Sequence, residues 1–283
     1  MTLFHIAADV IREAAGRRYL AAVFGLIAFA QIVLALSLDL DVVEGAIVAR
    51  KFFGNTVGGG NGGSTGAVAA EEHLRPMFRF LSTAVYHLGM LFGVVATGDI
   101  AVKSLSPGRV ELLLSLPVRR WQALLGIFIG VGGIALAGTV FAVGGFAAVL
   151  FWKAEYVTAA PLWGALMAVL GFLVVYSAML LATSTVRSAA LASGVGGVVY
   201  LLSIIADDRE EVRSWFTAGW GRELAGWLIA PLPRLRTLGK VGRDLAVGEP
   251  LDVEMLAPAA LAAVAFGAAC LVGAILQIER KDY

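Results

Sequence analysis

Residues 121–152 read WQALLGIFIGVGGIALAGTVFAVGGFAAVLFW, and the whole stretch contains no charged side chain. An α-helix rises about 1.5 Å per residue, so about 20 apolar residues suffice to cross the roughly 30 Å of hydrocarbon in a bilayer. This stretch is longer than one crossing requires and too short for two crossings joined by a turn. It predicts a single membrane-spanning helix that tilts or extends into the headgroups at Trp152.

The composition of the whole chain also predicts a membrane protein. Of its 283 residues, 59% are hydrophobic and 15% are charged, whereas soluble domains average about 45–50% apolar and about 25% charged residues. The mean hydropathy is +0.84. The net charge of +1 argues against nucleic-acid binding, because a binding face needs a basic excess to displace counterions from phosphates.

Further charge-free stretches resemble the first one and are expected to cross the membrane in the same way. The predicted spans are 19–38, 80–98, 121–152, 156–186, 188–206 and 255–278. We therefore expect an all-α polytopic protein with six transmembrane helices, forming one transmembrane domain over residues 1–283. Cys270 is the only cysteine, which excludes an intrachain disulfide and is typical of a small packing residue.

Lysine and arginine in the short connecting segments predict the orientation, because such residues stay on the cytoplasmic side. All basic short segments fall on one side: Arg12, Arg17 and Arg18 before the first span, Lys103, Arg109, Arg119 and Arg120 between the second and third, Arg187 between the fourth and fifth, and Arg280 and Lys281 at the end. Acids and bases mix in the alternate segments. Both termini are thus expected in the cytoplasm, with 39–79 and 207–254 as extracytoplasmic loops.

The amino-terminal residues 1–18 predict an amphipathic helix on the membrane surface. Their apolar side chains share one helical face: Leu3, Ile6, Ala7, Val10 and Ala14. The alternative is a cleaved signal peptide, since AFA at 28–30 has the small-x-small form of a signal-peptidase site. Cleavage would leave five spans and place one terminus on the other side, so the uncleaved chain is favoured.

The two long outer loops carry no recognisable catalytic motif. Residues 54–66, GNTVGGGNGGSTG, lack the lysine and the preceding strand of a phosphate-binding loop, and their composition is typical of a flexible linker. In the loop 207–254, Trp215, Trp220 and Trp227 fit an aromatic belt at the membrane interface. Substrate contact is the alternative for these tryptophans.

His87 is the clearest ionisable residue inside a predicted span, and such residues are candidates for function. It has no carboxylate or second histidine at helical spacing, and one histidine does not make a metal site. A packing role is favoured over contact with a substrate or its pathway. We expect no catalytic residue, no cofactor and no metal bound by this chain.

The segment 104–120 is expected to form a short apolar helix on the predicted cytoplasmic side. Val110, Leu113, Leu114 and Pro117 form one stripe after the turn at 106–108. An apolar face beside a membrane either lies in the interface or docks into a groove on another protein. Both possibilities stay open from the residues alone.

The stretch 106–130, SPGRVELLLSLPVRRWQALLGIFIG, resembles the ABC export permeases of the second type, whose membrane fold is called type V. In that family, a leucine run, proline, arginine and tryptophan lie in the same register between the second and third spans. The tail ERKDY at 279–283 is also similar to the family's ending. Subfamilies include permeases for drugs, lipids or glycans, and others that serve copper-enzyme maturation or gliding motility.

The resemblance implies that 104–120 is a coupling helix seated in a cleft of a separate ATPase, with 1–18 as an elbow helix beside it. The implied contact residues are Arg109, Glu111, Leu114, Pro117, Arg119 and Arg120. Lys103 and Ser104 replace residues that are usually acidic in the family, and Ile127 replaces a common lysine.

The sequence contains no Walker motif, so energy from ATP requires a partner chain that binds ATP and Mg. The resemblance implies the transmembrane subunit of an exporter in the bacterial cytoplasmic (inner) membrane. Two copies of the ATPase and a second permease chain, as a homodimer, are the implied partners, with an extracytoplasmic accessory protein as a further one. The alternatives are an ATP-independent transporter or channel, and an intramembrane enzyme that uses His87.

Overall fold

The structure is a computed structural model that describes residues 2–43, 46–52, 55–56, 68–106, 119–154, 158–208, 219–220, 223, 227, 229 and 231–280. Within this part of the chain, six helices are long and apolar enough to cross a membrane. They are α2 (Arg18–Ser37), α3 (Ala70–Ser104), α5 (Arg120–Ala154), α6 (Ala160–Thr185), α7 (Ala189–Asp207) and α11 (Val253–Arg280). The six expected spans are confirmed, and the chain is a multi-pass membrane protein.

Two of these helices are longer than the bilayer requires. α3 and α5 contain 35 residues each, which corresponds to about 52 Å, against roughly 30 Å of hydrocarbon. α3 begins at Ala70 and not at residue 80, because the last part of the expected outer loop 39–79 is helical and continues directly into the span. Both helices therefore reach beyond the hydrocarbon unless they tilt strongly.

α6 is the central helix of the bundle. In its apolar window 67% of the residues are buried, compared with 11–33% in the other five spans. It contacts α3, α5, α7, α11 and the short helix α10 (Leu235–Ala246). Apolar residues occupy every side of α6, which is typical of a helix surrounded by protein.

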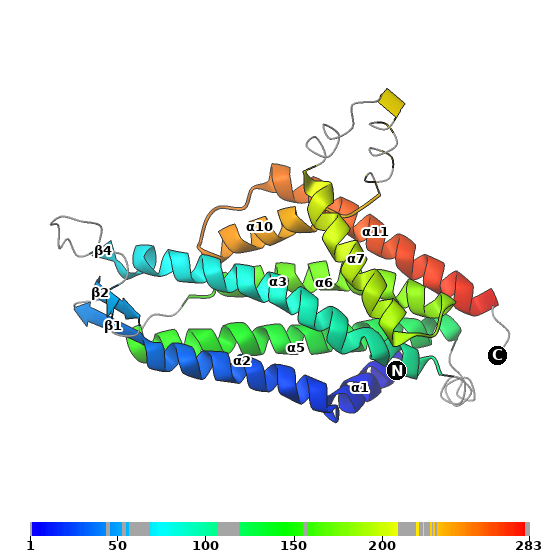
Figure 1. The fold of residues 1–283 in the computed structure, drawn as a ribbon, viewed down its shortest axis with the longest axis horizontal. Coiled ribbons are helices and arrows are strands. Elements are labelled where there is room, and N and C mark those ends of the chain that lie inside the picture. Colours follow the sequence, from blue (N-terminus) through cyan, green and yellow to red (C-terminus); the bar gives the residue numbers. More distant parts are fainter. Residues whose placement is uncertain are drawn as a thin grey trace.

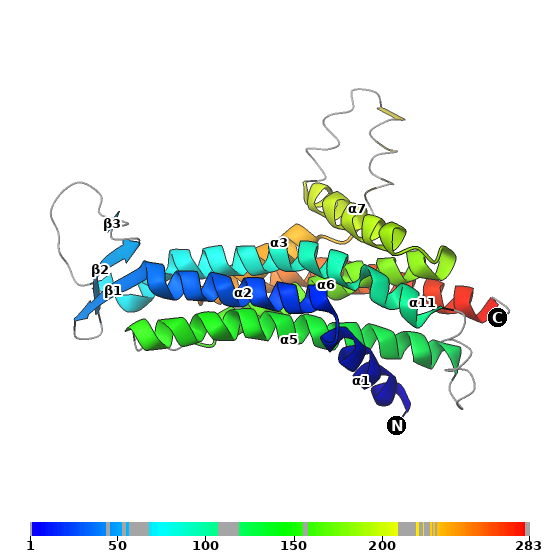
Figure 2. The same ribbon diagram turned by 60° about the horizontal axis from the view of Figure 1, so that its bottom comes forward.

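The elongated molecule has two different ends. α2, α3 and α5 run side by side along the long axis, and both chain termini lie at the end opposite the strands (Figures 1 and 2). The amino-terminal helix α1 (Thr2–Ala15) lies at the same end as the termini.

A small sheet lies in the expected outer loop 39–79, which the sequence did not predict. Its strands are β1 (Leu38–Val43), β2 (Ala46–Phe52), β3 (Asn55–Thr56) and β4 (Val68–Ala69). β2 pairs with all three others, always antiparallel. Valine and isoleucine are frequent in β1 and β2, and β-branched residues favour strands. Of the glycine-rich residues 54–66, only Asn55–Thr56 are described.

The second outer loop, 207–254, contains the amphipathic helix α10, which packs against α3, α6, α7 and α11. The side chain of Arg234, the residue just before α10, makes no capping hydrogen bond. Instead, the carboxylate of Asp207, at the end of α7, accepts hydrogen bonds from the backbone N–H of Thr237 at 2.7 Å and from its hydroxyl at 2.9 Å. Asp207 therefore satisfies an amide that the start of a helix leaves unpaired.

We predict that Asp207→Ala lowers the free energy of unfolding by about 1 kcal/mol, as the loss of a helix cap does. Asp208→Ala is the matched control: Asp208 pairs with Arg236, and both side chains are about half exposed, so the expected loss is below about 0.5 kcal/mol. Thermal unfolding in detergent, followed by circular dichroism, measures both changes. An equal loss for the two variants would contradict the capping role.

Candidate functional site

The candidate site is the end of the molecule where the termini lie and where 104–120 joins the two longest helices. α3 ends at Ser104 and α5 begins at Arg120. Residues 107–118 lie outside the described residues, and with them four of the expected contact residues, Arg109, Glu111, Leu114 and Pro117. The structure therefore describes the two helices that enter and leave the segment, and not its middle.

Of the expected contact residues, the structure describes Arg119 and Arg120, and it places them differently. Arg119 is exposed, and its backbone N–H donates to Oε1 of Gln122 at 3.0 Å. Glutamine three residues into a helix often satisfies the first backbone amide in this way. The side chain of Arg119 therefore stays at the surface beside the start of α5.

Arg120 instead binds the last turn of α11. Its Nη1 donates to the carbonyl oxygen of Ile278 at 3.1 Å and to that of Glu279 at 3.5 Å. The last carbonyls of a helix lack partners within the helix and carry partial negative charge, so a guanidinium stabilises them. Arg120 thereby ties the start of α5 to the end of α11, which sequence reasoning did not predict.

α1 packs directly on α5, at a face where α5 carries Gly126 and Gly130. A Cβ placed on Gly126 would lie 2.7 Å from Cγ2 of Ile6, and one on Gly130 would lie 2.8 Å from Cβ of Val10 and 2.9 Å from the carbonyl oxygen of Ala7. Any larger residue at these positions would collide with α1. Small residues at intervals of four let two helices approach this closely in membranes.

The buried residues of α1 match the apolar face expected from the sequence. Ile6, Ala7, Val10 and Ala14 are all buried, and Leu3, the fifth residue of that face, is partly buried. This face contacts α5, so the helix expected on the membrane surface is held by protein on its apolar side. Whether α1 acts as an elbow helix beside an ATPase stays a prediction.

A chain of ion pairs joins α1 to the end of α3. The guanidinium of Arg17 lies 2.5 Å from the carboxylate of Glu13 and 2.6 Å from that of Asp99, which in turn lies 2.9 Å from Nζ of Lys103. The Arg17 side chain is only 10% exposed. A partly buried pair of this kind is screened less than a surface pair, so it contributes more to holding α1 against α3.

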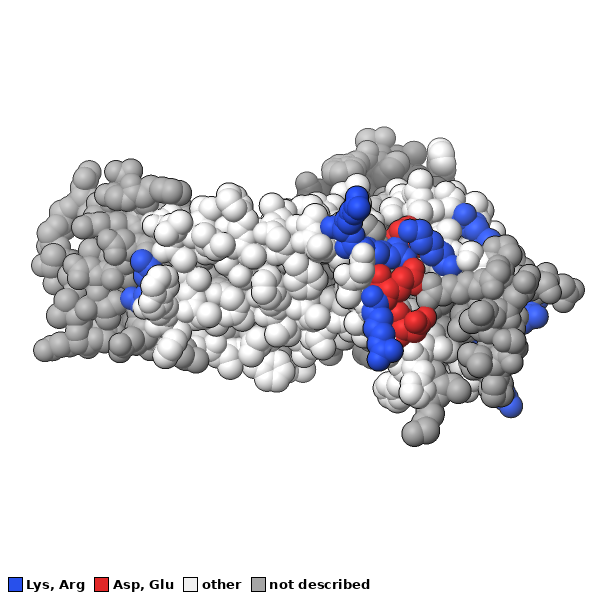
Figure 3. Space-filling view, turned by 90° about the horizontal axis from the view of Figure 1, so that it is seen from below, with Lys and Arg blue, Asp and Glu red and all other residues white. Residues whose placement is uncertain are grey.

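On the side of α1 and α2, charged and uncharged side chains occupy different parts of the surface (Figure 3). Charged side chains of both signs gather at the end where α1 lies, and a broad uncharged area separates them from the opposite end. This pattern is expected for a helical bundle that exposes its middle to hydrocarbon and its ends to headgroups and water. The charged side chains at this end therefore lie beyond the broad uncharged area.

His87 has a protein partner in the bundle. Its Nδ1 lies 2.5 Å from the hydroxyl of Tyr200 on α7, and its ring meets that of Tyr86 edge to face, with centroids 5.4 Å apart. Tyr86 itself donates to the carbonyl oxygen of Leu235 on α10 at 2.5 Å. These contacts join α3 to α7 and α10, which fits the packing role favoured from the sequence; contact with a substrate stays a prediction.

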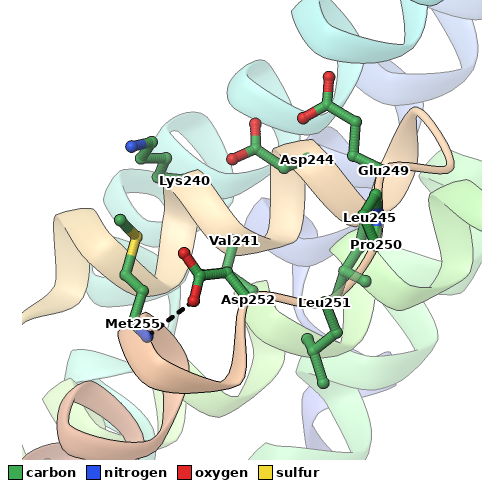
Figure 4. A pocket seen from close by; sticks show the side chains of 9 residues that line it. All are labelled: Lys240, Val241, Asp244, Leu245, Glu249, Pro250, Leu251, Asp252 and Met255. Carbon is green, nitrogen blue, oxygen red and sulfur yellow. Dashed lines mark hydrogen bonds between the residues drawn. The ribbon is translucent and has the colours of Figure 1, made fainter.

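A small acidic pocket of about 290 Å³ lies between α10 and the start of α11, and Figure 4 shows the side chains around it. Its carboxylates already have protein partners. Asp252 accepts the backbone N–H of Met255 at 3.1 Å, and Glu249 pairs with Arg79. In the described part of the chain, no group of three or more His, Cys, Asp or Glu residues could hold a metal ion.

Sequence reasoning missed how the elements at this end are joined, although one signal was present. Gly126 and Gly130 follow the small-xxx-small pattern that marks close helix contacts, but nothing in the pattern identifies α1 as the partner. The pairing of Arg17 with Asp99 and of Arg120 with α11 has no signal in local spacing, because each joins segments far apart in the chain.

Comparison with models of known protein families and with curated proteins found no match to this chain.

We predict that Gly130→Leu releases α1 from α5. Overpacking a close contact costs about 1–3 kcal/mol, so α1 should be detached about fivefold more often, or more. Gly144→Leu on the same helix is the control, because a Cβ there meets no described atom within 4 Å.

Limited trypsin digestion in detergent measures the release through the rate of cleavage after Arg12, Arg17 or Arg18. Faster cleavage in Gly130→Leu alone supports the docking of α1. Equal rates in both variants and in the unchanged chain would show that the glycine face does not hold it.

Proposed function

We propose that this chain is the transmembrane subunit of an ABC exporter-type transporter. A separate cytoplasmic ATPase binds ATP and Mg and pushes on the segment 104–120. The chain receives that displacement and passes it to the membrane helices, for export of a substrate or for transmission of force across the membrane. It forms part of the pathway wall and catalyses no reaction itself.

The observation that carries the proposal is the way the helices around 104–120 are joined. The segment connects α3 to α5, α1 contacts α5 through Gly126 and Gly130 and pairs with α3 through Arg17, and Arg120 links α5 to α11. A displacement at 104–120 would therefore reach four helices at once. A plain interfacial helix would not require such connections, whereas a force-receiving element does.

The resemblance of 106–130 to the export permeases supports the same proposal. It implies two ATPase subunits, a second copy of the permease chain and a cytoplasmic location of both termini in a bacterial inner membrane. The basic residues at the end of the molecule that holds the termini agree with that orientation under the positive-inside rule. An accessory protein on the outer side is a further proposed partner.

The proposed orientation predicts where an added thiol can be reached. We expect Lys153→Cys, at the end of α5, to react with a membrane-impermeant maleimide on spheroplasts. Arg119→Cys, just before the start of α5, should react only after permeabilisation. Replacing Cys270 with alanine first removes the only native thiol. Labelling of Arg119→Cys from outside would place 104–120 beyond the reach of any cytoplasmic ATPase.

The proposed coupling predicts that an ATPase polypeptide copurifies with the tagged full-length chain from native membranes. Charge reversal at two expected contacts, Glu111→Lys with Arg119→Glu, should lower the copurifying ATPase activity about tenfold or more, because like charges then face each other across the interface. Lys153→Glu, at the far end of α5, is the control and should leave it unchanged.

Two results would overturn the coupling. If no ATPase polypeptide accompanies the unchanged chain, the energy source proposed here is wrong. If the isolated chain alone moves solute across liposomes without ATP, the chain is an ATP-independent transporter or channel.

A further inference from the structure

A long apolar slot opens between α2 and α3. Its volume is about 700 Å³, and it reaches inward to α6, where Ala168, Val169 and Phe172 form its floor. α5 contributes a wall from Ile134 to Phe146. The slot thus runs from the outer surface of the bundle to its central helix, and protein surrounds it on several sides.

The slot is long enough to extend across most of the thickness of the hydrocarbon. On α2 its lining extends from Leu20 to Leu34, and on α3 from Pro76 to Thr97. At about 1.5 Å per residue these stretches are roughly 21 Å and 31 Å long, against about 30 Å of hydrocarbon. Its volume is therefore distributed along the direction in which lipid chains lie.

The side chains that line the slot require no hydrogen bond from a bound molecule. None of the described residues around the slot is charged, and its polar side chains are Gln31, Thr97 and Thr139. Gln31 donates to the carbonyl oxygens of Phe141 and Ala142 at 3.0 and 3.2 Å. Both threonine hydroxyls donate to carbonyls of their own helices, at 2.7 and 2.6 Å.

We propose that this slot binds one acyl chain of a membrane lipid. Water is disfavoured, because a bound water needs two to four polar partners and the polar groups of the slot are already paired. A loop of protein is disfavoured, because its backbone amides would find no acceptors there. An empty slot would forfeit the dispersion contacts of its walls. A hydrocarbon chain restores these contacts and requires no hydrogen bond.

A chain in the slot differs from the lipid that surrounds any membrane protein. Such lipid touches a protein on one side, whereas a chain in the slot contacts α2, α3, α5 and the floor on α6. More contacts give more dispersion energy, so the bound chain should exchange more slowly than its neighbours. The proposal concerns occupancy of the slot and does not rest on coupling to an ATPase.

The test uses the full chain in vesicles of phosphatidylcholine, a fraction of which carries a diazirine in the middle of one acyl chain. After irradiation, adducts are mapped by peptide mass spectrometry. We expect the slot-facing peptides of α2 and α3 to carry at least about threefold more adduct than the exposed apolar faces of α7 and α11.

Two glycines supply matched variants. Gly89 lines the slot, Gly197 lies on α7, and a Cβ on either meets no described atom within 4 Å. Gly89→Phe should obstruct the slot beside Gly89 and lower its adducts about threefold or more, whereas Gly197→Phe should leave them unchanged. Because phenylalanine favours helix over glycine, loss of folding is not expected in either variant, and thermal unfolding checks this.

Three outcomes would overturn the proposal. Equal adduct yields on all exposed helices would mean ordinary surrounding lipid only. Unchanged slot adducts in Gly89→Phe would mean that the labelled chains lie elsewhere. Protection of the slot from label, with cross-links between two copies of the chain, would mean that a second copy occupies it.

Discussion

Hydrocarbon provides no hydrogen-bond partner for a backbone amide, and most of this structure follows from that constraint. Only helices can satisfy their own amides while facing lipid, apart from closed barrels. Each charge-free stretch of the chain accordingly forms a helix, and the described strands lie only beside the first span, between Leu38 and Ala69. At the ends of the spans, polar contacts between side chains can then determine which helices are joined.

Within the apolar zone, close packing replaces the hydrophobic effect, because lipid tails are as apolar as leucine. α6 fills the centre, and small residues let other helices approach it closely, as Gly93 of α3 does at Phe172 of α6. Hydrogen bonds between side chains of different spans, such as that of His87 with Tyr200, are few among the described residues. Close packing therefore holds the helices together in the middle of the bundle, and ion pairs join them at the end where the termini lie.

The number and approximate bounds of the spans could be predicted because hydropathy is a local property. The apolar face of α1 could be predicted from helical spacing for the same reason. The packing of α10 and the contact of Arg120 with the last turn of α11 could not be predicted, because each depends on contacts between distant segments. For the candidate site, the role of 104–120 stays a prediction, and the sequence did not indicate that Arg119 is exposed while Arg120 binds the last turn of α11.

The two halves of the molecule consequently differ in how they resist displacement. At the end that holds the termini, Arg17, Asp99 and Arg120 fasten α1, α3, α5 and α11 to one another. Midway along, α2 and α3 are separated by an apolar slot that contains no direct polar link among the described residues. A force applied at the fastened end would move those helices together, whereas the spacing of α2 and α3 can change at little cost. Deformation should therefore concentrate at the slot.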